Sequence, residues 1–195
     1  IRLSNFNIMA TFTNLKTKLA GAFDALKGAL DYKNVMQAPR IEKVVVGTGT
    51  GKIEDKAKVK LIEDRLARIT GQKAAPRGAK QSIASFKLRQ GDIIGYQVTL
   101  RGPRMHSFLD KLIHVALPQT RDFRGIKLSS IDEMGNITIG IREHTIFPET
   151  ADEDIKDVFS LAVTIVTTAK TKQEAEALLR HVGLPLQKKE VAASK

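Results

Sequence analysis

Alternation of β-branched residues with small or polar ones is the feature that most constrains this fold. Residues 136–141 alternate isoleucine with asparagine, threonine and glycine, and residues 161–168 repeat the pattern with valine, isoleucine and threonine. Successive side chains of a strand point to opposite faces of a sheet, so the alternation predicts strands with one buried and one open face. Further strands are predicted at 41–46, 82–88 and 96–101.

Apolar residues at helical spacing separate these strands. They predict helices at 13–30, 55–69, 103–117 and 172–181. Gly71 and Gly183 follow two of the helices at their expected ends, and Pro118 is expected to stop a third. Residues 72–81 contain a proline and a glycine without periodicity, which predicts a basic loop.

Several connections between strands are too short for a helical crossover. The sequence therefore predicts an α+β fold: a two-layer domain with an antiparallel (mixed) sheet and helices packed on one face. We expect residues 13–188 to form this single domain. We expect a flexible extension at 1–12 before it and a loose tail at 189–195 after it. Met9 starts a plausible chain, so residues 1–8 are interpreted as an upstream extension.

Net charge points to the class of partner. The 195 residues carry a formal charge of +11, which predicts a polyanionic partner. More than half of this net charge lies in residues 72–104, which contain seven Lys and Arg and one Asp, a net charge of +6. Glycines and a proline interrupt this segment, as suits a surface that follows a phosphate backbone. Positive charge is spread along the chain and no run of 18 apolar residues occurs, so no membrane partner is expected.

Few residues in the sequence indicate catalysis, cofactor binding or metal binding. The segment 47–52, GTGTGK, has three residues between its outer glycines and lacks the Ser or Thr that a phosphate-binding Walker loop needs after lysine. The four histidines lack metal-ligand spacing, and cysteine is absent. Acidic residues at 149–157 suit a solvated or protein-facing edge.

The sequence has no Trp, two Tyr and eight Phe, so base stacking is not expected to dominate RNA binding. We expect neither enzyme activity nor a cofactor; a free RNA- or DNA-binding regulator and a small nucleotide-binding enzyme stay as alternatives.

Seven short blocks resemble one known family. They are VMQAPRIEK at 35–43, ITGQK at 69–73, AKQSIASFKLRQG at 79–91, VTLRG at 98–102, RDFRG at 121–125, IFPE at 146–149 and VTTAK at 166–170. In this order they resemble the bacterial-type large-subunit ribosomal protein five, the uL5 family. The resemblance covers residues 24–188 and implies an α+β protein of the central protuberance that binds 5S rRNA and adjacent 23S rRNA. It also implies contacts with the peptidyl-site (P-site) transfer RNA and with a small-subunit head protein. The expected location is the cytoplasmic ribosome, with an organellar ribosome as the alternative.

The resemblance also implies roles for individual residues. The expected 5S-binding residues are Arg40, Lys43, Gln72, Thr99 and Arg101. The expected transfer-RNA loop runs from Lys73 to Ser82 and includes Pro76, Arg77, Gly78 and Lys80. Other expected rRNA contacts are Lys87, Arg89, Arg121 and Arg124. Two departures stand out. Gly47 replaces the family's usual Asn, so the hydrogen bond expected to RNA is either missing or supplied by Thr48. Phe159-Ser160 replaces an Arg-Gly pair, which is expected to remove one electrostatic contact.

Overall fold

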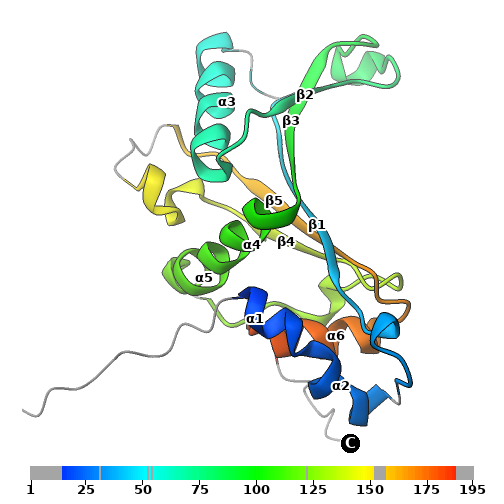
Figure 1. Cartoon of the computed structure of the whole chain (residues 1–195). Helices are drawn as coiled ribbons and strands as arrows, with labels where there is room; N and C mark the ends of the chain where they lie inside the picture. Colours follow the sequence, from blue (N-terminus) through cyan, green and yellow to red (C-terminus); the bar gives the residue numbers. More distant parts are fainter. Residues whose placement is uncertain are drawn as a thin grey trace, which may run out of the picture.

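The computed structural model describes residues 15–30, 32–51, 53, 55–121, 123–151 and 157–187. The predicted extension at 1–12 and the predicted tail at 189–195 lie outside these residues. The described chain is built on one five-stranded antiparallel sheet (Figure 1). From edge to edge its strands are β2 (Ala75–Gly78), β3 (Ile93–Leu100), β1 (Ile41–Gly49), β5 (Leu161–Thr167) and β4 (Ile137–Ile141).

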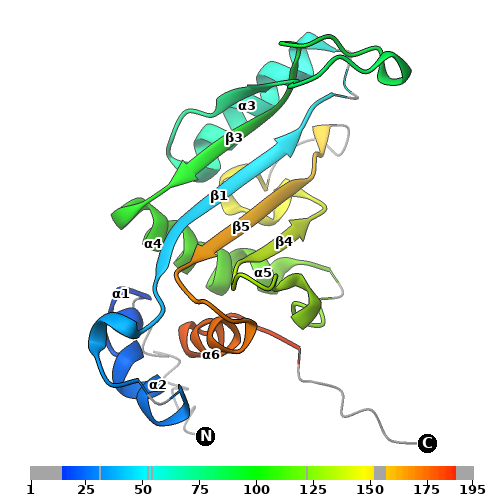
Figure 2. The same cartoon turned by 90° about the vertical axis from the view of Figure 1, so that its right-hand side faces the viewer.

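Helices cover one face of this sheet and close its lower end. The longer ones are α1 (Leu15–Ala20), α2 (Ala22–Leu30), α3 (Lys56–Thr70), α4 (Gly102–Lys111) and α6 (Lys172–Val182), and α5 (Leu117–Gln119) is a single turn. Figure 2 looks onto the opposite face, with α3, α4 and α5 behind the strands and α1, α2 and α6 below them. The predicted two-layer α+β fold is confirmed.

Strand register produces the buried and open faces that the alternation predicts. Val44 on β1 pairs with Leu100 on one side and Ile165 on the other, and all three side chains are at most 1% exposed. The next residue, Val45, pairs with Thr99 and points to the other face, where both side chains are half-buried. The core therefore lies between the sheet and the helices, and the second face stays open.

Two predictions for residues 72–88 are wrong. The predicted basic loop contains the edge strand β2, whose Pro76 pairs with Tyr96. A proline fits at an edge because an edge strand leaves alternate N–H groups without a ladder partner. The predicted strand at 82–88 is a 3-10 turn at Ala84–Phe86, closed by an isolated bridge between Ile83 and Leu88. Its apolar residues suggested burial, but the turn lies beyond the body of the sheet.

Helix ends agree with the prediction at two glycines and differ at two other places. Gly71 and Gly183 cap α3 and α6 with φ of 68° and 99°, the left-handed conformation that glycine adopts at low cost. The predicted helix at 13–30 is interrupted at Gly21. Pro118 does not stop its helix, which continues to Gln119. A π-helical turn at Leu112–Ala116 precedes the proline, and this wider turn accommodates a ring that would otherwise crowd the preceding carbonyl groups.

Candidate nucleic-acid interface

Small and polar side chains make the open face of the sheet nearly flat. At its centre Gly47 of β1 pairs with Gln97 of β3 and Ala162 of β5. Glycine, alanine and threonine continue this surface toward β4, where Gly140 pairs with Ala162. An open hollow of about 280 Å³ lies over β1, β3 and β5. A face this free of bulky groups allows a large rigid ligand to approach the strands closely.

Hydrogen bonds between side chains run across this face. Arg77 of β2 donates from Nε to Oε1 of Gln97 at 2.7 Å. The hydroxyl oxygens of Thr138 and Thr164, on β4 and β5, lie 3.1 Å apart. These four residues therefore present a guanidinium group, an amide and two hydroxyl groups, which are donors and acceptors suited to phosphate oxygens and ribose hydroxyls.

Four of the five predicted 5S-binding residues gather at one end of this face. The pairing of Val44 with Leu100 sets Lys43 of β1 beside Thr99 of β3 and Arg101, which directly follows β3. Gln72 joins them, because its Nε2 donates to the backbone oxygen of Thr99 at 3.4 Å. We call Lys43, Gln72, Thr99 and Arg101 the end cluster.

The end of α3 explains how Gln72 reaches β3. The left-handed Gly71 reverses the chain, and its N–H donates to the carbonyl of Ala67 at 2.8 Å. The hydroxyl of Thr70 contacts the carbonyl oxygens of Leu66 and Gln72 at 2.7 and 3.1 Å. These contacts hold residue 72 against the strand edge.

Charge at the end cluster is partly neutralised. Arg101 forms an ion pair with Glu42, Nη1 to Oε1 at 3.1 Å, with both side chains about half exposed. Lys43 is half-buried in the sheet surface. Arg40, the fifth predicted residue, is exposed just before β1, where its backbone N–H donates to the hydroxyl of Thr168 at 2.9 Å.

The predicted transfer-RNA loop is divided between two places. Lys73, Pro76, Arg77 and Gly78 follow the edge of the sheet, and Arg77 turns onto the open face. Lys80 and Ser82 lie farther out, on a hairpin arm that projects past the sheet (Figures 1 and 2). We define the arm tip as residues 80–92, which also holds Lys87 and Arg89.

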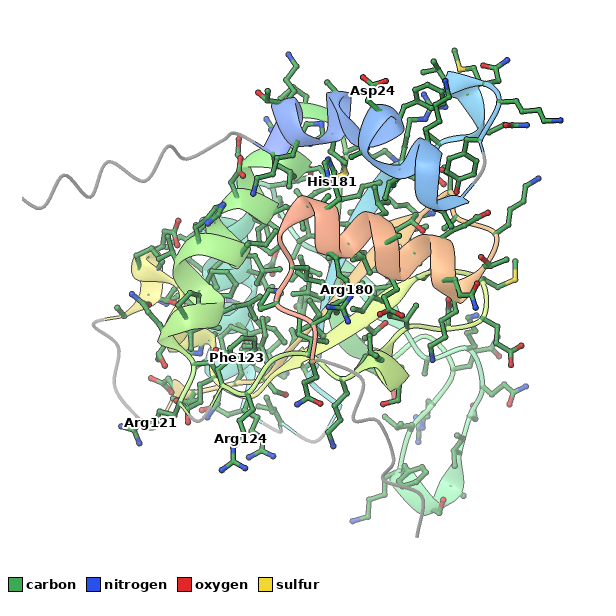
Figure 3. All side chains as sticks on the ribbon, turned by 90° about the horizontal axis from the view of Figure 1, so that it is seen from below. Asp24, Arg121, Phe123, Arg124, Arg180 and His181 are labelled. Atoms are coloured by element: carbon green, nitrogen blue, oxygen red, sulfur yellow. The ribbon has the colours of Figure 1, made fainter. Side chains whose placement is uncertain are left out.

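Arg121 and Arg124 lie apart from the end cluster. Both follow α5 and are exposed, and Figure 3 shows them directed away from the body, with Phe123 between them turned toward it. Phe123 packs against the core. Arg121 also lines a hollow of about 720 Å³ together with Arg142 and Glu143. Asp122 lies outside the described residues.

Packing inside the protein explains the departure at Phe159, and nothing in the structure explains the departure at Gly47. Phe159 is 7% exposed and stacks on the fully buried His144, with ring centroids 4.0 Å apart. The Thr48 hydroxyl donates to the carbonyl of Ser160 at 2.8 Å, so this hydrogen is used within the fold. Thr48 is therefore a poor substitute donor for RNA.

Sequence reasoning missed the residues that make the open face flat. Gln97, Thr164 and Ala162 occupy alternate strand positions, and the period of two that located the strands also marks these residues. Arg142 was missed as well, since a single arginine after a strand carries no pattern.

The described part of the chain contains no group of three or more His, Asp or Glu side chains placed to hold a metal ion. None of the described helices combines the length and apolarity needed to cross a membrane.

Comparison with known proteins identifies relatives along most of the chain. The family model described as "Ribosomal protein L5" matches residues 34–89, and the model of the C-terminal part of the same ribosomal protein family matches residues 93–186. The large ribosomal subunit protein uL5 of Ureaplasma urealyticum is 51% identical over 158 residues, which is 80% of this chain and 86% of the relative. Those of Halothermothrix orenii and Trichlorobacter lovleyi are 48% and 50% identical, each over 82% of this chain and 90% of the relative.

Proposed function

This chain belongs to the uL5 family of large-subunit ribosomal proteins, and we propose that it holds 5S rRNA through the open face of its sheet and the end cluster. Membership makes the chain a structural constituent of the large ribosomal subunit and not an enzyme. It also assigns the chain to the cytoplasmic ribosome, with rRNA and ribosomal proteins as partners.

The flat, open face is the observation that carries the 5S proposal. Helical RNA displays ribose hydroxyls and phosphates along a wide, shallow minor groove, and proteins recognise it mainly by shape. A surface of Gly47, Ala162 and Thr164 lets such a groove approach the strands without a steric obstacle. The helix-covered face has no comparable surface, because its strand residues are buried.

The end cluster offers two kinds of contact to RNA, ionic contacts with phosphates and hydrogen bonds from uncharged side chains. Lys43 and Arg101 supply phosphate contacts, whose contribution falls as salt rises. Gln72 and Thr99 supply an amide and a hydroxyl, which recognise 2′-hydroxyl groups or base edges with little dependence on salt. Arg40 and Arg77 add charge at the start of β1 and beside β3.

Other surfaces are proposed for other ribosomal partners. The exposed Lys80 and Ser82 at the arm tip are proposed to contact P-site transfer RNA, together with Lys73 nearer the sheet. The other rRNA-contacting residues, proposed to face 23S rRNA, are Lys87, Arg89, Arg121 and Arg124. A neighbouring small-subunit head protein is the proposed protein partner, and the expected protein-facing acidic edge at 149–157 lies partly outside the described residues.

A salt series with matched variants tests the 5S proposal. Affinity for 5S rRNA is compared with affinity for an unrelated structured RNA of equal length. Lys43→Gln is expected to weaken 5S binding and to reduce the slope of log K against log salt by about 0.7–0.9. Lys60→Gln on α3, an exposed lysine on a helix behind the sheet in Figure 2, is the charge-matched control and is expected to change neither quantity.

A second pair of substitutions separates recognition from charge. Gln72→Ala with Thr99→Val is expected to reduce the preference for 5S rRNA without changing the salt slope, because no phosphate contact is removed. Equal binding of both RNAs by the unaltered protein would contradict the proposal and favour a generic basic surface. An unchanged preference in the double variant would contradict the roles of Gln72 and Thr99.

A further inference from the structure

Phe86 at the arm tip is an aromatic side chain without a place in the core. It is 70% exposed, the largest exposure of any aromatic residue in the described part of the chain. Phe108, Phe147 and Phe159 are at most 7% exposed, and Tyr96 is 7% exposed. Packing in the core therefore accounts for the presence of these other rings. Phe86 has no such packing role in the stability of the fold.

Hydrogen bonds make the arm tip a preformed structure. Ile83 and Leu88 exchange two backbone hydrogen bonds, at 3.0 and 3.2 Å, which close the turn that carries Phe86. Lys87 adopts φ of 52°, and it is the one non-glycine residue with positive φ among the described residues. Such a conformation costs free energy in an L-residue and is retained where the surroundings require it. The ring is thus presented on a rigid turn, which lowers the entropy lost on binding.

Side chains around Phe86 define the chemistry of its partner. Lys80, Lys87 and Arg89 are exposed on the same tip. The one acid, Asp92, already accepts the backbone N–H of Arg89 at 2.8 Å through its carboxylate. An exposed ring among cations suits a polyanion that also offers flat aromatic faces, and RNA combines the two.

A protein partner is the competing explanation. Single exposed apolar residues are common, and the arm also exposes Ile83 at 42% and Ile93 at 53%. Three apolar residues on one arm would suit an apolar protein surface. The surplus of positive charge at the tip favours RNA, because interface cores between proteins are depleted of charged residues.

We propose that Phe86 stacks on the exposed face of a nucleobase in the RNA that the arm contacts. The inference rests on the proposed contact with P-site transfer RNA and names its recognition element: an unpaired base, or the outermost base of a stack, in the folded RNA. Lys80 holds a neighbouring phosphate. The arm then combines a salt-dependent contact with a stacking contact that tolerates any base.

Ribosomes that carry Phe86 variants test this inference. The measured quantity is the rate at which transfer RNA dissociates from the peptidyl site. Phe86→Ala removes the ring and is expected to raise this rate about fivefold or more, the low end for loss of a base–aromatic stack. Phe86→Leu keeps apolar volume without a flat face and is expected to behave like Phe86→Ala. Phe86→Tyr keeps the face and is expected to match the unaltered protein.

Companion variants distinguish failure of this inference from failure of the proposed function. Lys80→Gln removes charge from the tip and leaves Phe86 in place. If the lysine variant accelerates dissociation and Phe86→Ala does not, the stacking inference is wrong and the transfer-RNA contact stands. If neither accelerates it, both are wrong. Normal behaviour of Phe86→Leu beside a defective Phe86→Ala would also overturn stacking, because it indicates an apolar protein contact.

Discussion

Truncating two phenylalanines to alanine should have very different consequences for stability. Phe147 is fully buried, its ring lies 6.0 Å from that of Phe108 at an interplanar angle of 25°, and the Lys111 ammonium lies 5.8 Å from its centre. Phe86 is 70% exposed on the arm tip. The same chemical change therefore creates a cavity at one position and removes a solvated ring at the other.

The structure sets the size of the difference. Phe147→Ala should lower the free energy of unfolding by about 3–5 kcal/mol, the range for large aromatic truncations in cores. For a chain of this size, about 2–4 °C of melting temperature accompanies each kcal/mol, so we expect a decrease of about 6–20 °C. Phe86→Ala should stay within about 0.5 kcal/mol, or about 2 °C, because it removes no buried contact.

Thermal unfolding of the purified protein, followed by circular dichroism at fixed pH and salt, measures both values. The unaltered protein and the two variants are compared at equal concentration without RNA. A decrease for Phe86→Ala as large as that for Phe147→Ala would refute the reasoning, because it would mean that the arm tip packs against the body. A decrease of less than about 2 °C for Phe147→Ala would show that its surroundings collapse to fill the cavity.

Three further substitutions address the interface and the sheet. Glu42→Gln should tighten RNA binding about two- to fivefold, since it releases Arg101 and removes a repelling carboxylate, and a filter-binding titration that finds weaker binding would contradict this. Gly95→Ala should cost about 1–3 kcal/mol, because the new Cβ would lie 2.6 Å from a backbone oxygen of β1, while Gly49→Ala meets nothing within 4 Å and serves as the control in thermal melts. Burial raises the pKa of Tyr32 above 10.0. The stabilising contribution of this tyrosine is therefore complete below pH 10.0 and is lost as pH rises through the folded-state pKa. Denaturant titrations should find that the free energy of unfolding falls less at alkaline pH in Tyr32→Phe than in the unaltered protein.

Much of the body could be predicted because its pattern reflects burial. Alternation at 136–141 and 161–168 identified β4 and β5, and helical spacing identified α3 and α6. The family blocks lie mostly in other segments, one of them in the arm, and two of them overlap the ends of α3 and β5. Within the proposed interface, Lys43 and Thr99 lie on strands that the sequence predicts, but only the register of β1 with β3 places them together.

The arm was predicted incorrectly because both sides of it face solvent. An edge strand such as β2, exposed along its length, has no buried side, so its sequence lacks the alternation that reveals other strands. The strand predicted at 82–88 is wrong for a related reason, because its apolar residues, Phe86 among them, lie where no core exists. The sequence by itself determined the fold class, the family and the positive charge, because these depend on local period, short sequence blocks and composition. Tertiary structure alone decided which cations share a surface and which phenylalanine is exposed, because strand register and distance from the core depend on residues far apart in the chain.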